Sequence, residues 1–265
     1  EFARHGYVPP IKIDNLTVQG ADKGKNILEN ISMVIRSGEI YGLAGVDGNG
    51  QRELVEAITG IRPIHSGSVM LGNADLTQVG IRERMVAGIA QIPEDRQKHG
   101  LVLDFKVSEN MVLTTYKDSR FGKNGFLNDK EIERHASRLT SEFDVRSAGI
   151  QVAMRSLSGG NQQKAIIARE LTRDPQLLIA VQPTRGLDIG AIEFVHERLM
   201  QAKNEGKAIL LISYELDELY KMSDRIAVIN EGRIMGVLDR EEVNDEKLGL
   251  MMAGNKLGAK DGGAA

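Results

Sequence analysis

The sequence predicts an α/β protein with a mostly parallel sheet, an antiparallel β subdomain near the N-terminus and a helical subdomain at about residues 95–160. The first observation is that short apolar runs at residues 177–181, 208–213 and 225–229 alternate with amphipathic stretches of helical period. Apolar strands joined by helices are typical of a parallel sheet covered on both faces. The second observation is that strand patterns dominate the start of the chain, whereas helical patterns dominate residues 94–157.

The individual elements are predicted from their apolar periods and from the turn residues between them. Apolar residues predict strands at residues 11–16 and 27–35, and Gly20 and Gly24 mark the turn that separates them. Gly60 is expected to end the first helix. Further strands are predicted at residues 39–44, 68–71 and 89–92, and helices at residues 54–60, 107–111, 128–143, 188–203 and 216–222.

Composition narrows the class of protein. Hydrophobic residues make up 41% of the 265 residues and charged residues 27%, the balance of an ordinary globular domain. The net charge of -3 gives no reason to expect a nucleic-acid partner. Because the chain has no cysteine, disulfides and Cys-ligated metals are excluded. The five histidines show no metal-ligand spacing, so we expect no metal site of the protein's own. The sequence contains no run of about 18 consecutive apolar residues, the length that would predict a membrane-spanning helix.

Both ends of the sequence are expected to lie outside the folded domain. Residues 1–10 show no periodicity and end in two prolines, so they are interpreted as a linker or an expression remnant. Residues 256–265 are rich in glycine and alanine and are predicted to form a flexible tail. The folded domain is therefore expected to span residues 11–255.

A glycine-rich loop, GVDGNGQR at residues 45–52, follows a predicted strand and opens a helix. Glycines allow successive backbone N–H groups to converge on an anion at a helix N-terminus. The phosphate-binding pattern is G-x-x-x-x-G-K-[S/T], but Gln51 stands at the lysine position and Arg52 at the hydroxyl position. An ordinary strand-turn-helix corner is the alternative for this loop alone. The residues predicted to contact nucleotide are Gly45, Asp47, Gly48, Asn49, Gly50, Gln51, Arg52 and Glu53.

A second motif, LSGGNQQK at residues 157–164, precedes a predicted helix. Ser158 is a good N-cap, and the two glycines after it expose the backbone at the helix start. The motif resembles the signature motif of ABC-type ATPases, and LLIAVQPTRGLD at residues 177–188 resembles their Walker B strand and D-loop. The resemblance covers about residues 12–254 and implies the P-loop fold of ABC nucleotide-binding domains. Its signature residues are Leu157, Ser158, Gly159, Gly160, Asn161 and Gln162.

A narrower resemblance comes from the GVDGNGQ loop, PEDR at residues 93–96, GLVL at residues 100–103 and LSGGNQQK. Together they resemble the C-terminal nucleotide-binding domain of the tandem ATPases that power bacterial monosaccharide and nucleoside importers. The GNGQ and GLVLD runs are more similar to the nucleoside branch. The resemblance implies three partners: an N-terminal nucleotide-binding domain of the same polypeptide, transmembrane permease subunits and, indirectly, a solute-binding protein. It also implies a peripheral location on the cytoplasmic face of the plasma membrane.

The same resemblance implies that the domain's own ATP site is chemically incomplete. Val181 stands where a carboxylate should hold the Mg²⁺ shell, and Gln182 where a glutamate should polarise water. Tyr214 replaces the switch histidine, with a packed core tyrosine as the alternative. Glu94 is assigned to the lid position, and Asp188 of the D-loop is retained. ATP is therefore expected to bind weakly or without hydrolysis here, with Mg²⁺ only at the partner's site.

The intact signature motif implies that this domain completes the ATP site of its partner. The isolated domain is then expected to be weakly active or inactive. One alternative is a non-transport ABC protein, which would need intact catalytic residues and usually a basic surface. Another is a regulatory pseudo-ATPase, which differs only in whether nucleotide binds. A P-loop kinase would have no reason to carry LSGGNQQK.

Overall fold

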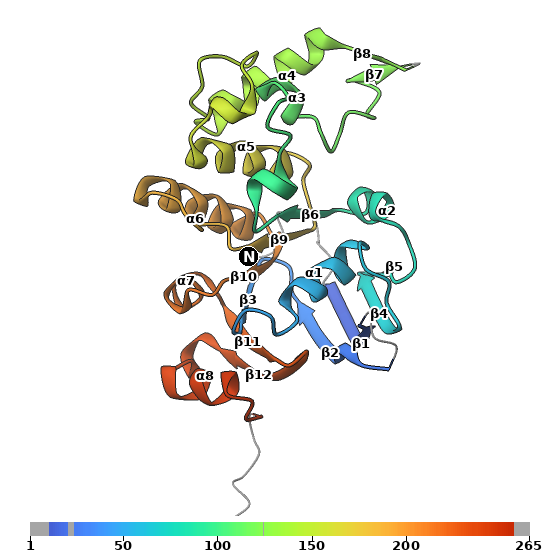
Figure 1. Cartoon of the computed structure of the whole chain (residues 1–265), viewed down its shortest axis with the longest axis vertical. Helices are drawn as coiled ribbons and strands as arrows, with labels where there is room; N and C mark the ends of the chain where they lie inside the picture. Colours follow the sequence, from blue (N-terminus) through green and yellow to red (C-terminus); the bar gives the residue numbers. More distant parts are fainter. Residues whose placement is uncertain (1–10, 21–23, 124, 257–265) are drawn as a thin grey trace, which may run out of the picture. The chain divides into compact units, whose positions relative to one another are not determined.

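The computed structural model describes residues 11–20, 24–123 and 125–256, and the chain divides into two compact units (Figure 1). The first unit holds the described residues of Glu1–Ile89, Gln176–Ala180 and Met200–Ala265. The second holds those of Ala90–Pro175 and Val181–Leu199. The chain passes between the units within β6 (Ile89–Ile92), within β9 (Leu177–Val181) and within α6 (Ile189–Asn204), among other points.

An antiparallel sheet lies in the N-terminal part of the first unit. Its strands are β1 (Ile11–Gln19), β2 (Asn26–Ile35), β4 (Ser66–Leu71) and β5 (Ala74–Asp75), in the order β2-β1-β4-β5. Ile11 and Ile13 of β1 are buried, whereas Lys12 between them is exposed, as the two-residue period of a half-buried strand requires. The predicted antiparallel β subdomain is confirmed.

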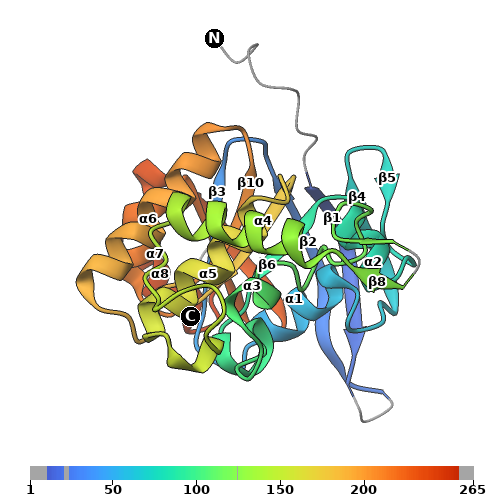
Figure 2. The ribbon, with the colours of Figure 1, turned by 90° about the horizontal axis from the view of Figure 1, so that it is seen from above.

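A second sheet of the first unit is centred on β3 (Ile40–Ala44). This strand pairs in parallel with both β10 (Ala208–Ile212) and β11 (Arg225–Asn230), and Figure 2 shows β10 beside it. The order of the strands is β12-β11-β3-β10-β9, with β12 (Arg233–Asp239) antiparallel to β11. Every residue of β3 and β10 is buried, which explains their continuous apolar sequence. The predicted mostly parallel sheet is confirmed.

Four α-helices of the first unit accompany these sheets: α1 (Gln51–Thr59), α2 (Ile81–Val86), α7 (Leu216–Met222) and α8 (Asp245–Met252). A short 3₁₀ helix, η3 (Arg240–Glu242), precedes α8. The C-terminus of α1 is held by Arg84 of α2, whose guanidinium donates to the carbonyl oxygens of Ala57 at 2.6 Å and Ile58 at 2.7 Å. Both carbonyls belong to the last turn of α1, where a helix has unpaired acceptors.

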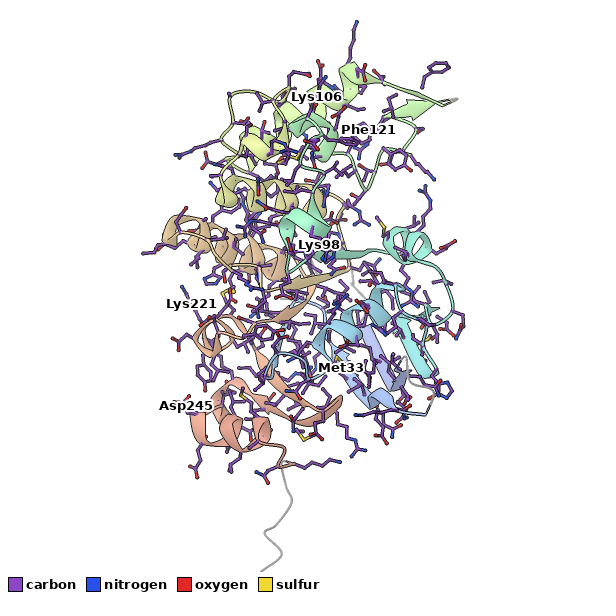
Figure 3. The ribbon with its side chains drawn as sticks, in the orientation of Figure 1. Met33, Lys98, Lys106, Phe121, Lys221 and Asp245 are labelled. Carbon is purple, nitrogen blue, oxygen red and sulfur yellow. The ribbon has the colours of Figure 1, made fainter. Side chains whose placement is uncertain are left out.

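The second unit is mainly helical. Its elements after β6 are η1 (Arg96–Gly100), α3 (Val107–Asn110), β7 (Gly122–Lys123), β8 (Phe126–Leu127), α4 (Asp129–Glu142), η2 (Met154–Ser156), α5 (Gly159–Leu171) and the first part of α6. Val112, Phe121 and Ile132 form a buried apolar cluster, and Phe121 (labelled in Figure 3) also packs on the ring of His135. The predicted helical subdomain at residues 95–160 falls within this unit.

Several elements were not predicted from the sequence: α2, the β7–β8 hairpin, β12 and α8. The predicted linker at residues 1–10 lies outside the described residues, as does the predicted tail apart from Lys256. Within the described ranges, no helix combines the length and apolar character that a membrane crossing requires.

Candidate functional site

The glycine-rich loop joins β3 to α1, and close packing explains its glycines. A Cβ atom on Gly45 would lie 2.6 Å from the carbonyl oxygen of Ile229, and one on Gly50 would lie 2.7 Å from the Leu28 side chain. Gly48 and Gly50 have φ angles of +85° and +108°, conformations that glycine adopts most readily. The loop can therefore keep this compact path into α1 only with glycine at these positions.

The two side chains that depart from the phosphate-binding pattern are both engaged within the loop and α1. Gln51 is only 3% exposed, and its Nε2 donates to the carbonyl oxygen of Val46 at 3.0 Å. The Arg52 side chain is 78% exposed, and its Nε donates to Oε1 of Glu56 at 2.8 Å. Burial acts to raise the pKa of Glu56, but hydrogen bonds from Arg52 and Arg62 outweigh it and hold that pKa below its usual value.

Residues distant in sequence hold the loop in place. The hydroxyl of Tyr214 donates to Oδ1 of Asp47 at 2.8 Å, across 167 positions of the chain. Asn49 accepts from the Glu231 amide at 2.8 Å through Oδ1, and from the Gly232 amide at 2.9 Å through its carbonyl. Tyr214 is 36% exposed, so it is not a tyrosine packed wholly in the core. The switch position and the turn between β11 and β12 thus both contact the loop.

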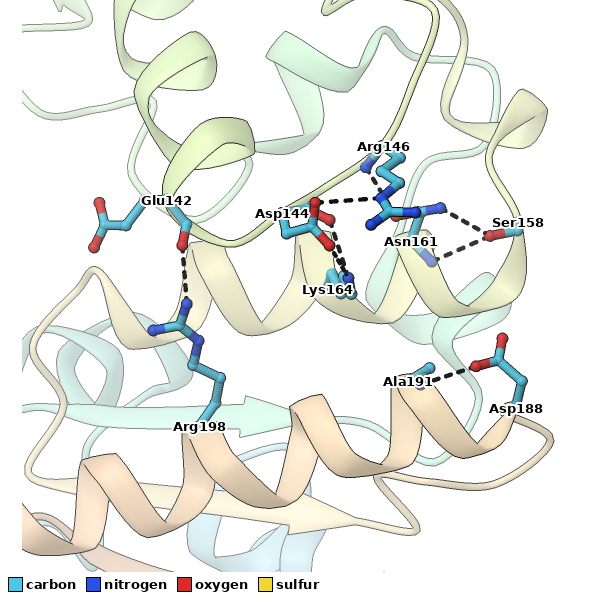
Figure 4. A network of polar contacts seen from close by, with 9 residues as sticks. All are labelled: Glu142, Asp144, Arg146, Ser158, Asn161, Lys164, Asp188, Ala191 and Arg198. Carbon is cyan, nitrogen blue, oxygen red and sulfur yellow. Dashed lines mark hydrogen bonds and ion pairs between the residues drawn. The ribbon is translucent and has the colours of Figure 1, made fainter.

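The signature motif, residues 157–162, caps and begins α5 (Figure 4). The Ser158 hydroxyl oxygen accepts from the backbone amide of Asn161 at 3.4 Å and from its Nδ2 at 3.0 Å. Asn161 Oδ1 in turn accepts from the Arg146 amide at 2.8 Å. Gln162 is 2% exposed and donates from Nε2 to the Leu157 carbonyl at 3.2 Å. The predicted N-cap is confirmed, and the motif is fixed by its own side chains.

Charged contacts secure the rest of α5 and the neighbouring α6 (Figure 4). The Lys164 ammonium lies 2.7 Å from Oδ2 of Asp144 and 4.7 Å from the centre of the Phe194 ring. Its hydrogen bond is the main reason that the pKa of Asp144 lies below its usual value. Arg198 of α6 donates to the Glu142 carbonyl at 2.9 Å. The helix that carries the signature motif is therefore anchored at several points.

The D-loop residue Asp188 lies close to the signature motif. Its Oδ1 accepts from the Ala191 amide at 2.9 Å and so caps the start of α6. A Cβ atom on Gly160 would lie 3.1 Å from Cβ of Ala191 and 3.7 Å from Oδ2 of Asp188. A glycine at residue 160 lets the starts of α5 and α6 approach each other at this distance. The structure thus brings two of the predicted site segments together.

Glu94 and Gln182, the positions assigned to the lid and the water-polarising residue, have different surroundings. The carboxylate of Glu94 pairs with the guanidinium of Arg185 at 2.5 Å. Gln182 follows β9 with a φ of +47° and is 6% exposed. Its Nε2 has no hydrogen-bond partner within the described parts of the chain. Next to it, the Pro183 carbonyl accepts from Nε2 of Gln163 at 2.7 Å, which ties this segment to α5.

The glycine-rich loop and the start of α5 are better suited to binding an anion than a metal ion. No group of three or more His, Cys, Asp or Glu side chains among the described residues could hold a metal. Arg52 is cationic and Val181 aliphatic, so neither can ligate Mg²⁺ at the glycine-rich loop. Gln182 can donate a hydrogen bond but cannot act as a general base at neutral pH. What remains is a compact glycine loop before α1 and a capped N-terminus of α5, both suited to contact with phosphate.

Two residues make contacts that the sequence analysis did not predict, although the PEDR run that contains Arg96 was noted. Val46 contributes only its carbonyl oxygen, which no pattern of residue types reveals. Arg96 donates from Nη1 to the Arg185 carbonyl at 3.0 Å, beside the Glu94 carboxylate that pairs with the Arg185 guanidinium. The sequence feature that could have pointed to Arg96 is its place in the PEDR run, two residues after Glu94.

Comparison with known proteins adds evidence from whole sequences. The family model described as ABC transporter matches residues 28–185. The chain is 50% identical over 247 residues to the nucleoside import ATP-binding protein NupA of Lactococcus lactis, covering 93% of the chain and 49% of that protein. It is 48% identical to the guanosine import ATP-binding protein NupO of Bacillus subtilis, covering 92% and 48%. The ribose import ATP-binding protein RbsA 2 of Rubrobacter xylanophilus is 38% identical, with 93% and 47% covered. The chain spans about half the length of these curated relatives.

Solved structures show the same fold at low sequence identity. The ATP-binding cassette MJ1267 aligns with a TM-score of 0.75 at 22% identity, covering 91% of this chain and 97% of that one. A dimeric post-hydrolysis state of the cassette MJ0796, bound to ADP and phosphate, aligns with a TM-score of 0.73 at 21% identity, covering 87% and 98%. Since both identities are low, these likenesses support the architecture alone.

Proposed function

The chain belongs to the ABC transporter family of ATP-binding proteins, and from this premise we propose that it is the C-terminal nucleotide-binding domain of a tandem importer ATPase. In this proposal the signature motif of the chain completes the ATP site of an N-terminal partner domain, while the chain's own glycine-rich loop does not support hydrolysis. The assembled protein couples ATP hydrolysis to uptake through permease subunits at the cytoplasmic face of the membrane. Curated relatives about twice the length of the chain support the tandem arrangement.

The observation that carries the proposal is the placement of Gln51. Phosphoryl transfer in P-loop ATPases is mostly positioning and charge stabilisation, to which a lysine and Mg²⁺ contribute. Here the residue at the lysine position is neutral, buried and hydrogen-bonded to the Val46 carbonyl of its own loop. Arg52, at the Mg²⁺-ligand position, pairs with Glu56. Hydrolysis at this loop would therefore lack both cations on which the reaction depends.

The signature motif, in contrast, retains what an anion-binding helix start needs. Ser158 caps α5, two glycines follow it, and Gln162 and Asn161 fix the cap through hydrogen bonds. A capped 13-residue helix presents free backbone N–H groups and the positive end of its dipole. In this proposal the bound anion is the terminal phosphate of a nucleotide held by the partner domain.

The names of the relatives support a proposal for the substrate class. The relatives at 50% and 48% identity are named for import of nucleosides and of guanosine, whereas the ribose importer is 38% identical. We therefore assign a nucleoside as the transported solute. Uptake of a labelled nucleoside, compared with uptake of labelled ribose, by cells that express the intact transporter tests this assignment. Uptake of ribose alone would contradict it.

Paired substitutions in the full-length protein, assembled with its membrane subunits, test the division of labour. Ser158→Ala should reduce ATP hydrolysis by roughly 10²-fold or more, the order observed when one transition-state donor is removed. Gln51→Ala should change the rate far less. Ser156→Ala is the matched control, because this exposed serine lies two residues away and its hydroxyl donates to the Ala153 carbonyl outside the signature motif. Loss of hydrolysis in Gln51→Ala together with a silent Ser158→Ala would reverse the proposed roles.

Calorimetric titration of this chain with ATP tests the incomplete site. Binding should be weak and should not tighten when Mg²⁺ is added, because no carboxylate or hydroxyl stands at the Mg²⁺-ligand positions. Absence of all binding would favour a regulatory pseudo-ATPase. Tight Mg²⁺-dependent binding with turnover would refute the proposed incompleteness.

A further inference from the structure

Polar contacts join the segments after β6 and β9 in the second unit, next to the start of α5. Arg96 donates from Nη1 to the carbonyl oxygen of Arg185 at 3.0 Å. The Arg185 guanidinium pairs with Glu94, two residues before Arg96. The Arg96 guanidinium also lies against Gly159 of the signature motif. The segment after β6, the segment after β9 and the start of α5 therefore meet at one side chain, that of Arg96.

The position of Arg96 is fixed by its own backbone. It opens η1, a π-helical turn capped by Asp95, whose Oδ1 accepts from the amides of Gln97 at 3.1 Å and Lys98 at 3.0 Å. The bond from the Lys98 amide is the main reason that the pKa of Asp95 lies below its usual value, so the cap is a carboxylate at neutral pH. Gln97 then donates to Oε1 of the buried Gln162 at 3.1 Å. The turn is thus attached to the signature motif directly after Arg96, through Gln97.

The Arg96 guanidinium lies close to Gly159. A Cβ atom at residue 159 would lie 2.7 Å from Nη2 and 3.4 Å from Cζ of Arg96. Real Cβ atoms do not approach a neighbour to 2.7 Å, so a side chain at residue 159 would push the flexible end of Arg96 aside and strain its bond to the Arg185 carbonyl. The Nε atom of Arg96 is buried and has no hydrogen-bond partner in the described part of the chain.

The Arg96 guanidinium beside Gly159 does not stabilise α5 itself. The N-terminus of a helix carries partial positive charge, so a guanidinium beside it is unfavourable on its own. What the contact fixes is the position of Gly159 relative to residues 183–188. Those residues include the Pro183 carbonyl, held by Gln163, and Asp188, whose side chain caps α6.

We propose that Arg96 is a positioning residue for the signature motif, which holds the start of α5 in register with the D-loop by bonding to the Arg185 carbonyl. The inference rests on the proposed function, because the positioned groups are those that the partner's nucleotide is proposed to contact. Glu94 contributes to the same arrangement, because its carboxylate pairs with the guanidinium of Arg185 while Arg96 donates to the backbone carbonyl of Arg185. Displacement of Arg96 should shift Ser158 and the amides after it from the phosphate, and so weaken the binding of ATP at the composite site.

The test measures ATP hydrolysis by the full-length protein assembled with its membrane subunits. Arg96→Gln removes the charged bond to the Arg185 carbonyl and should raise the KM for ATP by up to roughly tenfold, the full value of one charge-assisted hydrogen bond, since this bond positions the motif and does not itself contact ATP. Arg96→Lys should restore part of the affinity, because a lysine can still donate one bond but lacks the planar fork. Arg134→Gln, at an exposed arginine of α4 paired with Glu131, is the matched control and should leave KM unchanged.

A second pair of variants tests the contact with Gly159 directly. Gly159→Ala should raise KM in the same direction as Arg96→Gln but by less, since it strains the bond to Arg185 that Arg96→Gln removes. The double variant should then be no worse than the more severe single variant, whereas independent effects would multiply. Thermal unfolding of each variant should follow that of Arg134→Gln, because the proposed role concerns position rather than folding.

The outcomes separate this inference from the proposed function. If Ser158→Ala abolishes hydrolysis while Arg96→Gln retains the wild-type KM, the inference fails and the proposed function stands. A fall in kcat at constant KM that tracks a lower unfolding temperature would give Arg96 a merely structural role and would overturn the inference. A silent Ser158→Ala would refute the proposed function, and the inference with it.

Discussion

Arg84 is the buried cation that holds the end of the phosphate-loop helix, and its replacement by methionine tests how α1 is secured. Arg84 is 2% exposed. Its guanidinium donates to four carbonyl oxygens, those of Ala57 at 2.6 Å, Ile58 at 2.7 Å, Val79 at 3.0 Å and Thr77 at 3.0 Å. Burial lowers the pKa of Arg84, and Asp75 opposes this lowering, so the guanidinium remains charged at neutral pH.

The expected loss of stability follows from these contacts. Methionine has a similar length and keeps the packing of the stem, but it removes the guanidinium donor from four acceptors, of which Ala57 alone keeps a long bond from the Gly60 amide at 3.4 Å among the described residues. One buried acceptor without a partner costs about 1–3 kcal/mol, and some of the four can recover water at the rim. The gain from no longer burying a guanidinium offsets part of this cost. We expect Arg84→Met to lower the free energy of unfolding by about 3 kcal/mol, which corresponds to roughly 6–12 °C in melting temperature.

Urea unfolding followed by circular dichroism measures this difference, together with calorimetric melting. Arg82→Met is the matched control, because Arg82 is an exposed arginine of the same helix, and it should change stability by less than about 0.5 kcal/mol. Arg84→Lys should fall between the two, since a lysine reaches fewer of the four carbonyls. Stability of Arg84→Met within about 1 kcal/mol of the wild-type value would refute the claim that this arginine secures α1.

Two further predictions concern pH and backbone conformation. Burial, reinforced by nearby arginines, lowers the pKa of His135 from 6.5 to about 4, so its contribution to stability should be full above pH 6.5 and fall as the pH drops from 6.5 to 4. Urea titrations of His135→Gln should lose this slope, and an unchanged slope would contradict the assignment. Gly232 has a φ of +71°, and a Cβ there would lie 1.8 Å from the Ile27 carbonyl, so Gly232→Ala should destabilise by roughly 2–4 kcal/mol in the same assay. Gly249→Ala in α8, where no atom lies within 4 Å of the added Cβ, should be neutral or stabilising, and equal losses in both variants would contradict this reasoning.

Elements with strong local signals were predicted well from the sequence. The strands at residues 208–213 and 225–229 correspond to β10 and β11, because a strand buried on both faces must be apolar throughout. Ser158 was recognised as an N-cap because a hydroxyl beside free helix amides is a local requirement. In contrast, β12 and α8 were missed. β12 alternates exposed and buried residues irregularly and is paired only with β11, and α8 buries only Leu248 and Met251.

What the sequence by itself determined is the chemistry that is absent and the motifs that are present. A glutamine cannot supply the charge of a lysine, a valine cannot ligate a metal, and a serine before the run at residues 159–164 predicts the N-cap of α5. Only the tertiary structure decided which partners these side chains contact. Gln51 donates to the Val46 carbonyl, Tyr214 donates to Asp47, and Arg96 lies against Gly159. The physical reason is the sequence separation over which each interaction acts. Residue type and cap geometry act within a few positions, whereas these contacts depend on carbonyls and side chains that the fold brings together from distant segments.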